Sequence, residues 1–306
     1  MPGATSPLRT LKESVVLPAL AAALPWAWGF ALLRRFAAGD DLYPELAQAA
    51  CDGAATVCPV GDRRAWKQRY RLIRLVDHCD MFLVRTRSRR WFRRHVDVEG
   101  AWPASGPFIA MTFHWGAGLW ALDDLRASGV PARFLSARID PAGFNGDWVA
   151  HAYARSRNRT VESAGGAPVI YTGGATQAIR RALDESHAVV ALYDIPATPD
   201  HATLRTMVCG RVVELPAGLA NLAVTTGVPI VPFSMGVDCA TGRRQLRIDD
   251  AFRPANAQDF ADRLADALTR LIRTDTAAWH FSALAPQFFA ATAAESASAA
   301  PPSQAA

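Results

Sequence analysis

From residue 107 onward, short apolar runs alternate with segments whose apolar residues recur at helical spacing. The apolar runs predict strands over 108–113, 132–137, 168–171, 188–193, 229–233 and 245–249. The helical spacing predicts helices over 117–127, 147–155, 176–185, 218–226 and 257–273. Apolar strands that alternate with helices indicate a mainly parallel sheet covered on both faces. The predicted fold class is therefore α/β, with a mainly parallel sheet flanked by helices.

The N-terminal region contains a second kind of pattern. Residues 15–33, "VVLPALAAALPWAWGFALL", are 19 uncharged residues, just enough to span a bilayer as a helix. Pro18 and Pro25 interrupt this stretch, and Trp26 and Trp28 suit a membrane–water interface. Three interpretations remain open: a single membrane anchor, an interfacial or re-entrant helix, or a signal segment. We expect residues 1–36 to form a membrane-associated helix in front of the α/β domain.

The remaining sequence divides into three parts. Residues 37–62 are rich in Gly, Ala and Asp and are expected to form a connector. Residues 63–290 carry the predicted α/β domain. The segment 291–306, "ATAAESASAAPPSQAA", has low complexity and is expected to be a disordered tail.

Charge is unevenly distributed in this chain of 306 residues. Half of the residues are apolar and a fifth are charged, which is typical of a globular protein, and the net charge is +5. Eleven arginines fall between residues 63 and 94, interleaved with Trp66, Tyr70, Trp91 and Phe92. A basic helix with aromatic residues suits an anionic membrane surface, although an ordinary solvated face has the same composition. Nucleic acid is not an expected partner, because no nucleic-acid-binding module follows and the charge is local.

Several kinds of chemistry find no support in the sequence. The five cysteines are scattered, so neither a disulfide framework nor a zinc site is expected. The seven histidines lack metal-ligand spacing. The G-x-S-x-G elbow, the P-loop and the dinucleotide-binding glycine pattern are also missing. No metal or redox cofactor is therefore expected.

Two polar residues follow predicted strands in positions that suit catalysis. His114 follows the strand "FIAMTF", and Asp194 follows the strand "AVVALY". In open α/β sheets, sites lie beyond the carboxyl ends of the strands. If the two strands are parallel, His114 and Asp194 emerge at the same edge of the sheet.

The region 63–290 resembles the lysophospholipid acyltransferase superfamily, and within it the bacterial lipid A biosynthesis acyltransferases. The resemblance rests on "FIAMTFHWGAGLWALDD", "RSRNRTV", "GRVVELPAGLANLAVTTGVPIVPFSMG" and a late segment containing Trp279. It implies transfer of an acyl group from acyl carrier protein or coenzyme A to the hydroxyl of a lipid or glycolipid. His114 would be the general base, and the protein would lie on the cytoplasmic face of the bacterial inner membrane. The acidic carrier protein could dock on the arginines of residues 63–94.

The chain departs from the family motif His-x-x-x-x-Asp/Glu, in which the acid orients the histidine. Leu119 occupies the position of that acid. Asp123, Asp124 and Asp194 are the candidate replacements, and Asp123 would lie one helical turn beyond Leu119. Two other interpretations follow from the missing acid. One is a weakened homologue that binds a lipid or another protein of its pathway, and the other is an acyl-ester hydrolase.

The resemblance also suggests substrate-binding residues. Arg155, Arg157 and Arg159 match a basic family segment and are expected in a loop, where they could hold an acceptor phosphate or the phosphopantetheine of the donor. Gly210 is a further candidate, although a glycine at this position is more typical of a turn.

Overall fold

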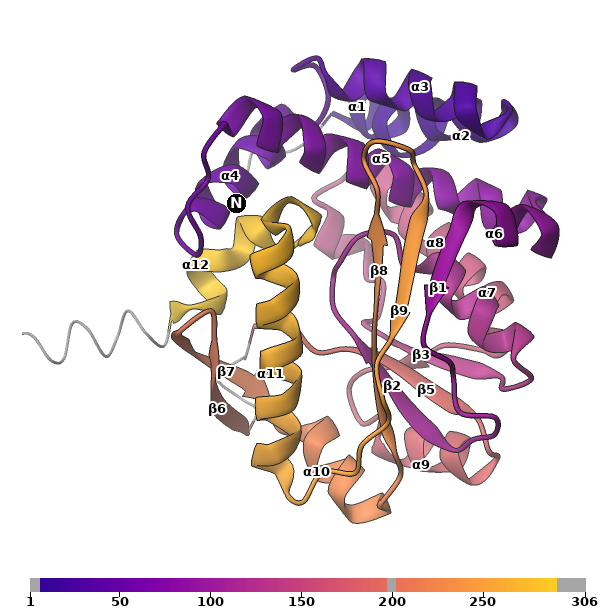
Figure 1. The fold of residues 1–306 in the computed structure, drawn as a ribbon, viewed down its shortest axis with the longest axis vertical. Coiled ribbons are helices and arrows are strands. Elements are labelled where there is room, and N and C mark those ends of the chain that lie inside the picture. The colour runs from indigo at the N-terminus through magenta and orange to yellow at the C-terminus, as the bar shows by residue number, and fades with distance from the viewer. Residues whose placement is uncertain (1–5, 197–201, 291–306) are drawn as a thin grey trace, which may run out of the picture.

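The computed structural model describes residues 6–196 and 202–290. Its centre is a seven-stranded sheet with the strand order β1-β9-β8-β2-β5-β3-β4 (Figure 1). The strands are β1 (Val96–Glu99), β2 (Phe108–Thr112), β3 (Ala132–Ser136), β4 (Ile170–Tyr171), β5 (Ala188–Leu192), β8 (Ile230–Val237) and β9 (Arg244–Ile248). Neighbouring strands are parallel except for the β8–β9 pair, which is antiparallel. The mainly parallel α/β sheet predicted from the sequence is confirmed.

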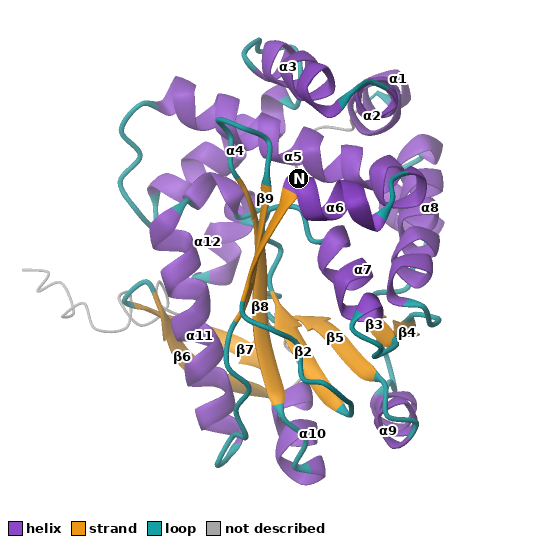
Figure 2. Ribbon diagram, turned by 45° about the vertical axis from the view of Figure 1, so that its right-hand side comes forward, coloured by secondary structure: helices purple, strands orange, loops and turns teal. Residues whose placement is uncertain are grey.

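Helices cover both faces of this sheet (Figure 2). One side carries α7 (Leu119–Ala127) and α8 (Trp148–Gly165), which pack on each other. The other side carries α9 (Thr176–Asp184), α10 (Gly218–Thr226) and the long α11 (Ala257–Thr274). There Arg180 of α9 hydrogen-bonds Thr225 of α10, and α10 packs on α11. The antiparallel hairpin of β6 (Thr203–Val208) and β7 (Arg211–Pro216) packs on α11. The chain then turns through short 3₁₀ helices, Thr276–Ala278 and Ser282–Leu284, into α12 (Ala285–Phe288).

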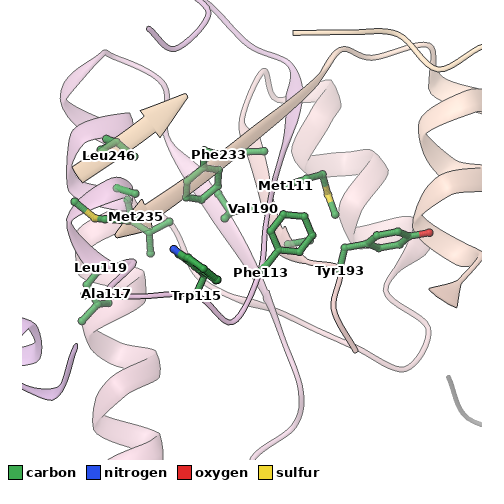
Figure 3. Close-up of a cluster of buried hydrophobic side chains, with 14 of the residues drawn as sticks. Met111, Phe113, Trp115, Ala117, Leu119, Val190, Tyr193, Phe233, Met235 and Leu246 are labelled. Carbon is green, nitrogen blue, oxygen red and sulfur yellow. The ribbon is translucent and has the colours of Figure 1, made fainter. Parts of the chain in front are cut away.

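The central strands are buried because both of their faces are covered. Val190 of β5 and Phe233 of β8 lie on one face of the sheet, and Met111 of β2 points to the other face. All three belong to the cluster of buried side chains shown in Figure 3. Phe113 and Trp115 continue this cluster beyond the end of β2. The continuous apolar runs in the sequence reflect this double burial.

Several segments differ from the expectation, among them the hairpin of β6 and β7, which was not among the predicted strands. The expected connector 37–62 contains helix α4 (Pro44–Ala55), because its alanines pack into the core at helical spacing. The loop expected at residues 155–161 is wrong, since these residues form the middle of α8. Asp147 caps the start of α8, and Gly166 ends it in the left-handed conformation. Strand β1 was not among the predicted strands, because it lies at the sheet edge, where its exposed residues form no apolar run.

The N-terminal stretch 15–33 is divided between two helices. After α1 (Pro7–Leu11), the chain forms a π-helical turn (Lys12–Val16), then α2 (Leu17–Ala23) and α3 (Trp26–Ala37). Leu24 is extended between them, as expected for a residue that precedes a proline. Both helices pack on the 24-residue helix α5 (Arg63–Thr86), which continues into α6 (Arg89–His95). Within residues 6–196 and 202–290, no helix combines the length and the apolar character needed to cross a bilayer.

Candidate active site

His114 and Asp194 lie side by side because their strands are neighbours in register. β2 pairs with β5 in parallel, with Thr112 opposite Leu192. Each strand then continues by two residues to His114 and Asp194. The Nδ1 atom of His114 lies 2.8 Å from Oδ1 of Asp194. The expectation that both residues emerge at one edge of the sheet is therefore met.

The Asp194 carboxylate is fully buried, at 0% exposure, and receives several N–H groups. The backbone N–H of His114 lies 3.0 and 2.9 Å from its two oxygens. The indole N–H of Trp279 donates to Oδ2 at 2.8 Å. Hydrogen bonds to the charged form of a buried carboxylate offset its desolvation. Asp194 is therefore suited to hold a protonated Nδ1 of His114 in one orientation.

The segment 278–281 returns from the C-terminal end and runs antiparallel beside residues 114–116. Gly116 N–H donates to the carbonyl of Ala278 at 2.9 Å, and His280 N–H donates to the carbonyl of His114 at 2.8 Å. The Phe281 ring stacks on the His114 imidazole, with ring centroids 3.7 Å apart and an interplanar angle of 16°. The imidazole is thus fixed by Asp194 at one nitrogen and by Phe281 on one ring face.

His114 faces a cavity of about 1160 Å³ at this edge of the sheet. The cavity wall is predominantly apolar and extends between the sheet and helices α7, α8, α9 and α10. Typical apolar residues in it are Leu122, Phe134, Val161, Ile179 and Leu222. Leu119, which occupies the place of the family's acid, is also part of this wall and is 2% exposed. The cavity has the size and lining of a site for a large, mainly apolar ligand.

One part of the cavity wall is polar. Arg157 of α8 pairs with Asp77 of α5 at 2.9 Å, and His280 lies beside them. Burial alone would raise the pKa of Asp77, but the Arg157 guanidinium and nearby histidines outweigh burial and lower the pKa to about 2. Burial and the positive charge of Arg74 lower the pKa of His280 to about 4. At neutral pH this wall therefore carries one ion pair and an uncharged imidazole.

The nearby polar residues extend this wall into the protein. His280 Nε2 lies 2.7 Å from the carbonyl oxygen of Gly116 and is therefore the protonated nitrogen of the neutral ring. His78 Nδ1 hydrogen-bonds Tyr153 Oη, and burial lowers the pKa of His78 to about 3. The His78–Tyr153 contact joins the helices α5 and α8, which carry Asp77 and Arg157, and the His280–Gly116 contact joins the C-terminal segment to the turn after β2.

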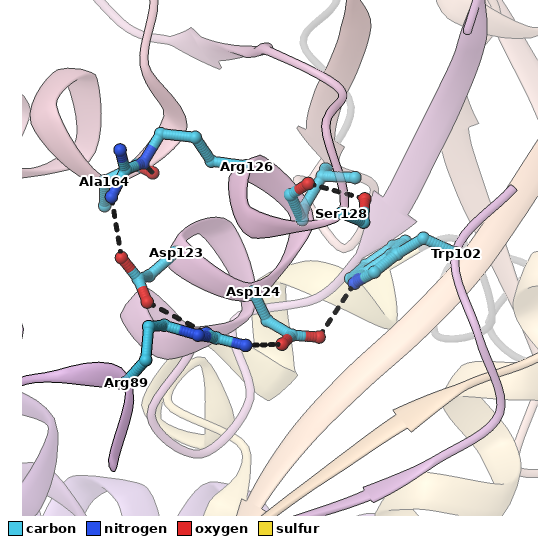
Figure 4. Close-up of polar contacts among 8 residues, drawn as sticks. Arg89, Trp102, Asp123, Asp124, Arg126, Ser128 and Ala164 are labelled. Carbon is cyan, nitrogen blue, oxygen red and sulfur yellow. Dashed lines mark hydrogen bonds and ion pairs between the residues drawn. The ribbon is translucent and has the colours of Figure 1, made fainter. Parts of the chain in front are cut away.

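Asp123 and Asp124 belong to a separate group of charges on α7 (Figure 4). Arg89 pairs with Asp123 at 3.0 Å and with Asp124 at 2.6 Å. Arg126 also pairs with Asp123 at 3.0 Å, and the indole N–H of Trp102 donates to Asp124 at 3.2 Å. Of the three carboxylates proposed from the sequence, Asp194 is the one that contacts the His114 ring within the described chain. Asp123 and Asp124 instead fix α6 and the residue Trp102 to α7.

The arginines of α8 face two directions, because residues two apart lie on opposite sides of a helix. Arg157 points to Asp77 and the main cavity. Arg155 and Arg159 instead line a second, open recess of about 660 Å³. Gly210 lies in the β6–β7 turn, where Cys209 and Gly210 have φ values of 52° and 77°. Two consecutive positive φ values are typical of a tight hairpin turn, and Gly210 is part of neither cavity wall.

Trp279 lies in a segment that contributes to the family resemblance, but no sequence pattern indicated its hydrogen bond to Asp194, and Phe281 and Asp77 gave no signal. Only the folded chain brings Trp279 to Asp194, Phe281 to the His114 ring and Asp77 to the cavity wall. No protein-family model matches the chain, and no curated protein matches it. The assignment of a function therefore depends on the chemistry of the site.

Proposed function

We propose that this protein is an acyltransferase that moves a fatty acyl group from an acyl thioester to a lipid or glycolipid hydroxyl. The observation that carries the proposal is the contact of 2.8 Å between His114 Nδ1 and the buried Asp194 carboxylate at the wall of a large apolar cavity. A histidine oriented by a carboxylate is a general base, and an apolar cavity suits a fatty acyl chain. The resemblance of residues 63–290 to lipid acyltransferases points in the same direction.

In this mechanism His114 Nε2 accepts the proton of the acceptor hydroxyl. The hydroxyl oxygen attacks the thioester carbonyl carbon, and a C–O bond forms. The C–S bond then breaks, and the leaving thiolate takes the proton from Nε2, so that the products are an ester and a thiol. Asp194 stabilises the transient imidazolium through Nδ1–H, as in other base–orienter pairs. Acyl carrier protein or coenzyme A would carry the thioester.

The position of Asp194 bears on the alternative of a weakened homologue. That alternative rests on Leu119 in place of the expected acid. Asp194 supplies a carboxylate to the ring from β5, while Leu119 contributes to the apolar wall. We therefore favour an active enzyme in which the orienting acid comes from a different strand.

We also propose that the protein works at an anionic membrane surface, for a bacterial enzyme the cytoplasmic face of the inner membrane. Helices α1 to α3 lie together at one end of the molecule (Figure 1). They expose large apolar side chains, with Leu8 at 77%, Leu20 at 57% and Trp28 at 70% exposure. Exposed Leu and Trp residues next to basic residues are typical of interfacial helices. Cosedimentation with phosphatidylglycerol vesicles should fall in Leu20→Glu/Trp28→Glu, and unchanged binding would contradict this part of the proposal.

The acyl transfer is tested with the full chain purified in an uncharged detergent. Wild type and His114→Ala are incubated with acyl-carrier-protein and coenzyme A thioesters and a panel of hydroxyl-bearing lipids, and ester products are measured by mass spectrometry. We expect wild type to form an ester and His114→Ala to lose at least about 10²-fold in rate. Equal rates would overturn the role of His114. Thioester loss without an ester product would instead indicate a hydrolase, and binding without turnover would indicate a binding protein.

A further inference from the structure

The ring of Phe281 stacks on the candidate base and makes no other ring contact within residues 6–196 and 202–290. Its centroid lies 3.7 Å from that of the His114 imidazole, and the two planes are inclined by 16°. The other aromatic residues of the C-terminal segment pack on one another, with the Trp279 ring centroid 5.5 Å from that of Phe288 and 6.4 Å from that of Phe289. Phe281 is only half-buried and lines the main cavity together with His114. The ring contact of Phe281 is therefore with the base, and not with the aromatic cluster beside it.

The backbone around Phe281 is fixed by hydrogen bonds. The hydroxyl oxygen of the buried Ser282 lies 3.0 Å from the carbonyl oxygen of Thr276 and 2.6 Å from that of Trp279. The Leu284 N–H donates to the Phe281 carbonyl at 2.8 Å, and the residue before Phe281 is bonded to the backbone of the base itself. The stacked position of Phe281 is therefore built into the folded chain and needs no ligand to form it.

Asp194 and Phe281 restrain the imidazole at an edge and at a face. Asp194 Oδ1 lies 2.8 Å from Nδ1 of His114, whereas Phe281 covers one face of the ring. The lone pair of a neutral imidazole nitrogen lies in the ring plane, so a group stacked on the face does not block Nε2. The His114 side chain keeps 27% exposure. A substrate hydroxyl can therefore approach Nε2, while rotation of the imidazole would break both contacts.

The face of a phenyl ring also distinguishes the two protonation states of a general base. This face carries the negative end of the ring quadrupole and attracts a cation within about 6 Å of the ring centroid. A histidine base is neutral before it takes a proton and positive afterwards, so the attraction strengthens as the proton is transferred. An interaction that strengthens towards the transition state raises kcat rather than the affinity for the substrate.

We propose that Phe281 is a positioning residue of the active site. It holds the His114 imidazole in its working orientation, and its π face stabilises the imidazolium that forms during proton transfer. This role rests on the proposed function only in that His114 acts as a base, and it applies equally to acyl transfer and to ester hydrolysis. Phe281 itself makes and breaks no bond.

The electrostatic part of this role is tested by replacing Phe281 in the full chain with para-fluoro-, difluoro- and trifluorophenylalanine. Each added fluorine withdraws electron density from the ring face, while the shape of the side chain hardly changes. We expect kcat to fall with each fluorine, to a loss of about tenfold, while KM stays the same. The same series at Phe288 is the control, because Phe288 packs on Trp279 and has no ring contact with His114 in the described chain. A kcat that does not depend on fluorination, or an equal fall in the Phe288 series, overturns the electrostatic role.

The positioning part is tested without turnover. Carbon NMR relaxation measures the motion of the His114 imidazole in wild type, Phe281→Tyr and Phe281→Leu. We expect the imidazole to become more mobile in Phe281→Leu, with a loss of at least about tenfold in kcat, while Phe281→Tyr stays close to wild type in both. Equal motion in all three proteins overturns the positioning role. If wild type transfers no acyl group to any acceptor, the proposed function fails, and the relaxation comparison still decides whether Phe281 holds the imidazole.

Discussion

The indole N–H of Trp279 donates a hydrogen bond of 2.8 Å to the Asp194 carboxylate, 85 residues away in the sequence. This contact connects the C-terminal segment to the same carboxylate that holds His114. Asp194 therefore lies between the candidate base and an aromatic residue that is itself fully buried. The arrangement makes the base dependent on packing at two distant parts of the chain.

Replacing Trp279 with Phe should remove one donor from a buried carboxylate while keeping most of the aromatic packing. We expect a loss of about 1–3 kcal/mol in the free energy of unfolding, measured by denaturant titration. We also expect kcat for acyl transfer to fall while KM stays the same, because Asp194 is held less firmly. Trp102→Phe is the matched control, since its indole N–H donates to Asp124 instead. An equal fall in kcat for both variants would contradict a specific role of Trp279.

Asp194→Asn should remove the carboxylate that stabilises the transient imidazolium of His114 and should favour the wrong tautomer of the ring. We expect kcat to fall by about 10³–10⁴-fold, as for the loss of the orienting acid in comparable triads. Asp123→Asn, in a carboxylate that pairs with Arg89 and Arg126, should retain the wild-type kcat within a few fold. Initial rates below the unfolding temperature of both variants measure the difference. A larger loss in Asp123→Asn would shift the orienting role to α7.

Acidification should destabilise the fold through His280. Its pKa is lowered to about 4, mainly because the ring is buried, whereas an unfolded histidine has a pKa of about 6.5. Between these values the unfolded chain binds more protons, so stability is lost as the pH falls from about 6.5 to 4. Asp80 acts in the opposite direction, since burial raises its pKa to about 6.

The variant His280→Gln separates the contribution of His280 to the pH dependence from that of Asp80, because Asp80 is present in both proteins. Gln can still donate to the carbonyl of Gly116 but does not titrate. We expect the free energy of unfolding of wild type, but not of the variant, to include a loss of up to about 3 kcal/mol over this pH range. Denaturant titrations at several pH values measure how steeply the free energy of unfolding depends on pH in wild type and in His280→Gln. Parallel curves would show that His280 has no part in the pH dependence.

Gly116→Ala should disrupt the turn that follows His114. Gly116 has a φ of +61°, and an added Cβ would lie 1.9 Å from the carbonyl oxygen of Met235. Since that oxygen belongs to the backbone of β8, we expect a loss of more than about 2 kcal/mol in the free energy of unfolding. Gly129→Ala is the control, because Gly129 also has a positive φ, +95°, but has open space around it. Similar losses in the two variants would attribute the effect to backbone conformation alone.

Much of the site could be predicted from the sequence because it depends on strand ends. Apolar runs located β2 and β5, and the rule that sites lie beyond the carboxyl ends of parallel strands selected His114 and Asp194. The arginine pattern around residues 155–159 was also visible. The loop expected for these residues was wrong, because they lie in helix α8. This helix has few buried residues, such as Val161, and many polar ones, so the sequence shows no clear apolar pattern of helical spacing.

The residues at the ends of the strands can be read from the amino-acid sequence, since burial on both faces demands continuous apolar runs. The folded core sets the order of the strands: β2 and β5 are neighbours in register, so that Asp194 rather than Asp123 or Asp124 contacts the ring. It also determines that Trp279 and Phe281 return to His114 and that α8 divides its arginines between two cavities. The reason is physical: a strand or helix follows from local periodicity, whereas the order of strands and the approach of distant segments depend on how the whole core packs.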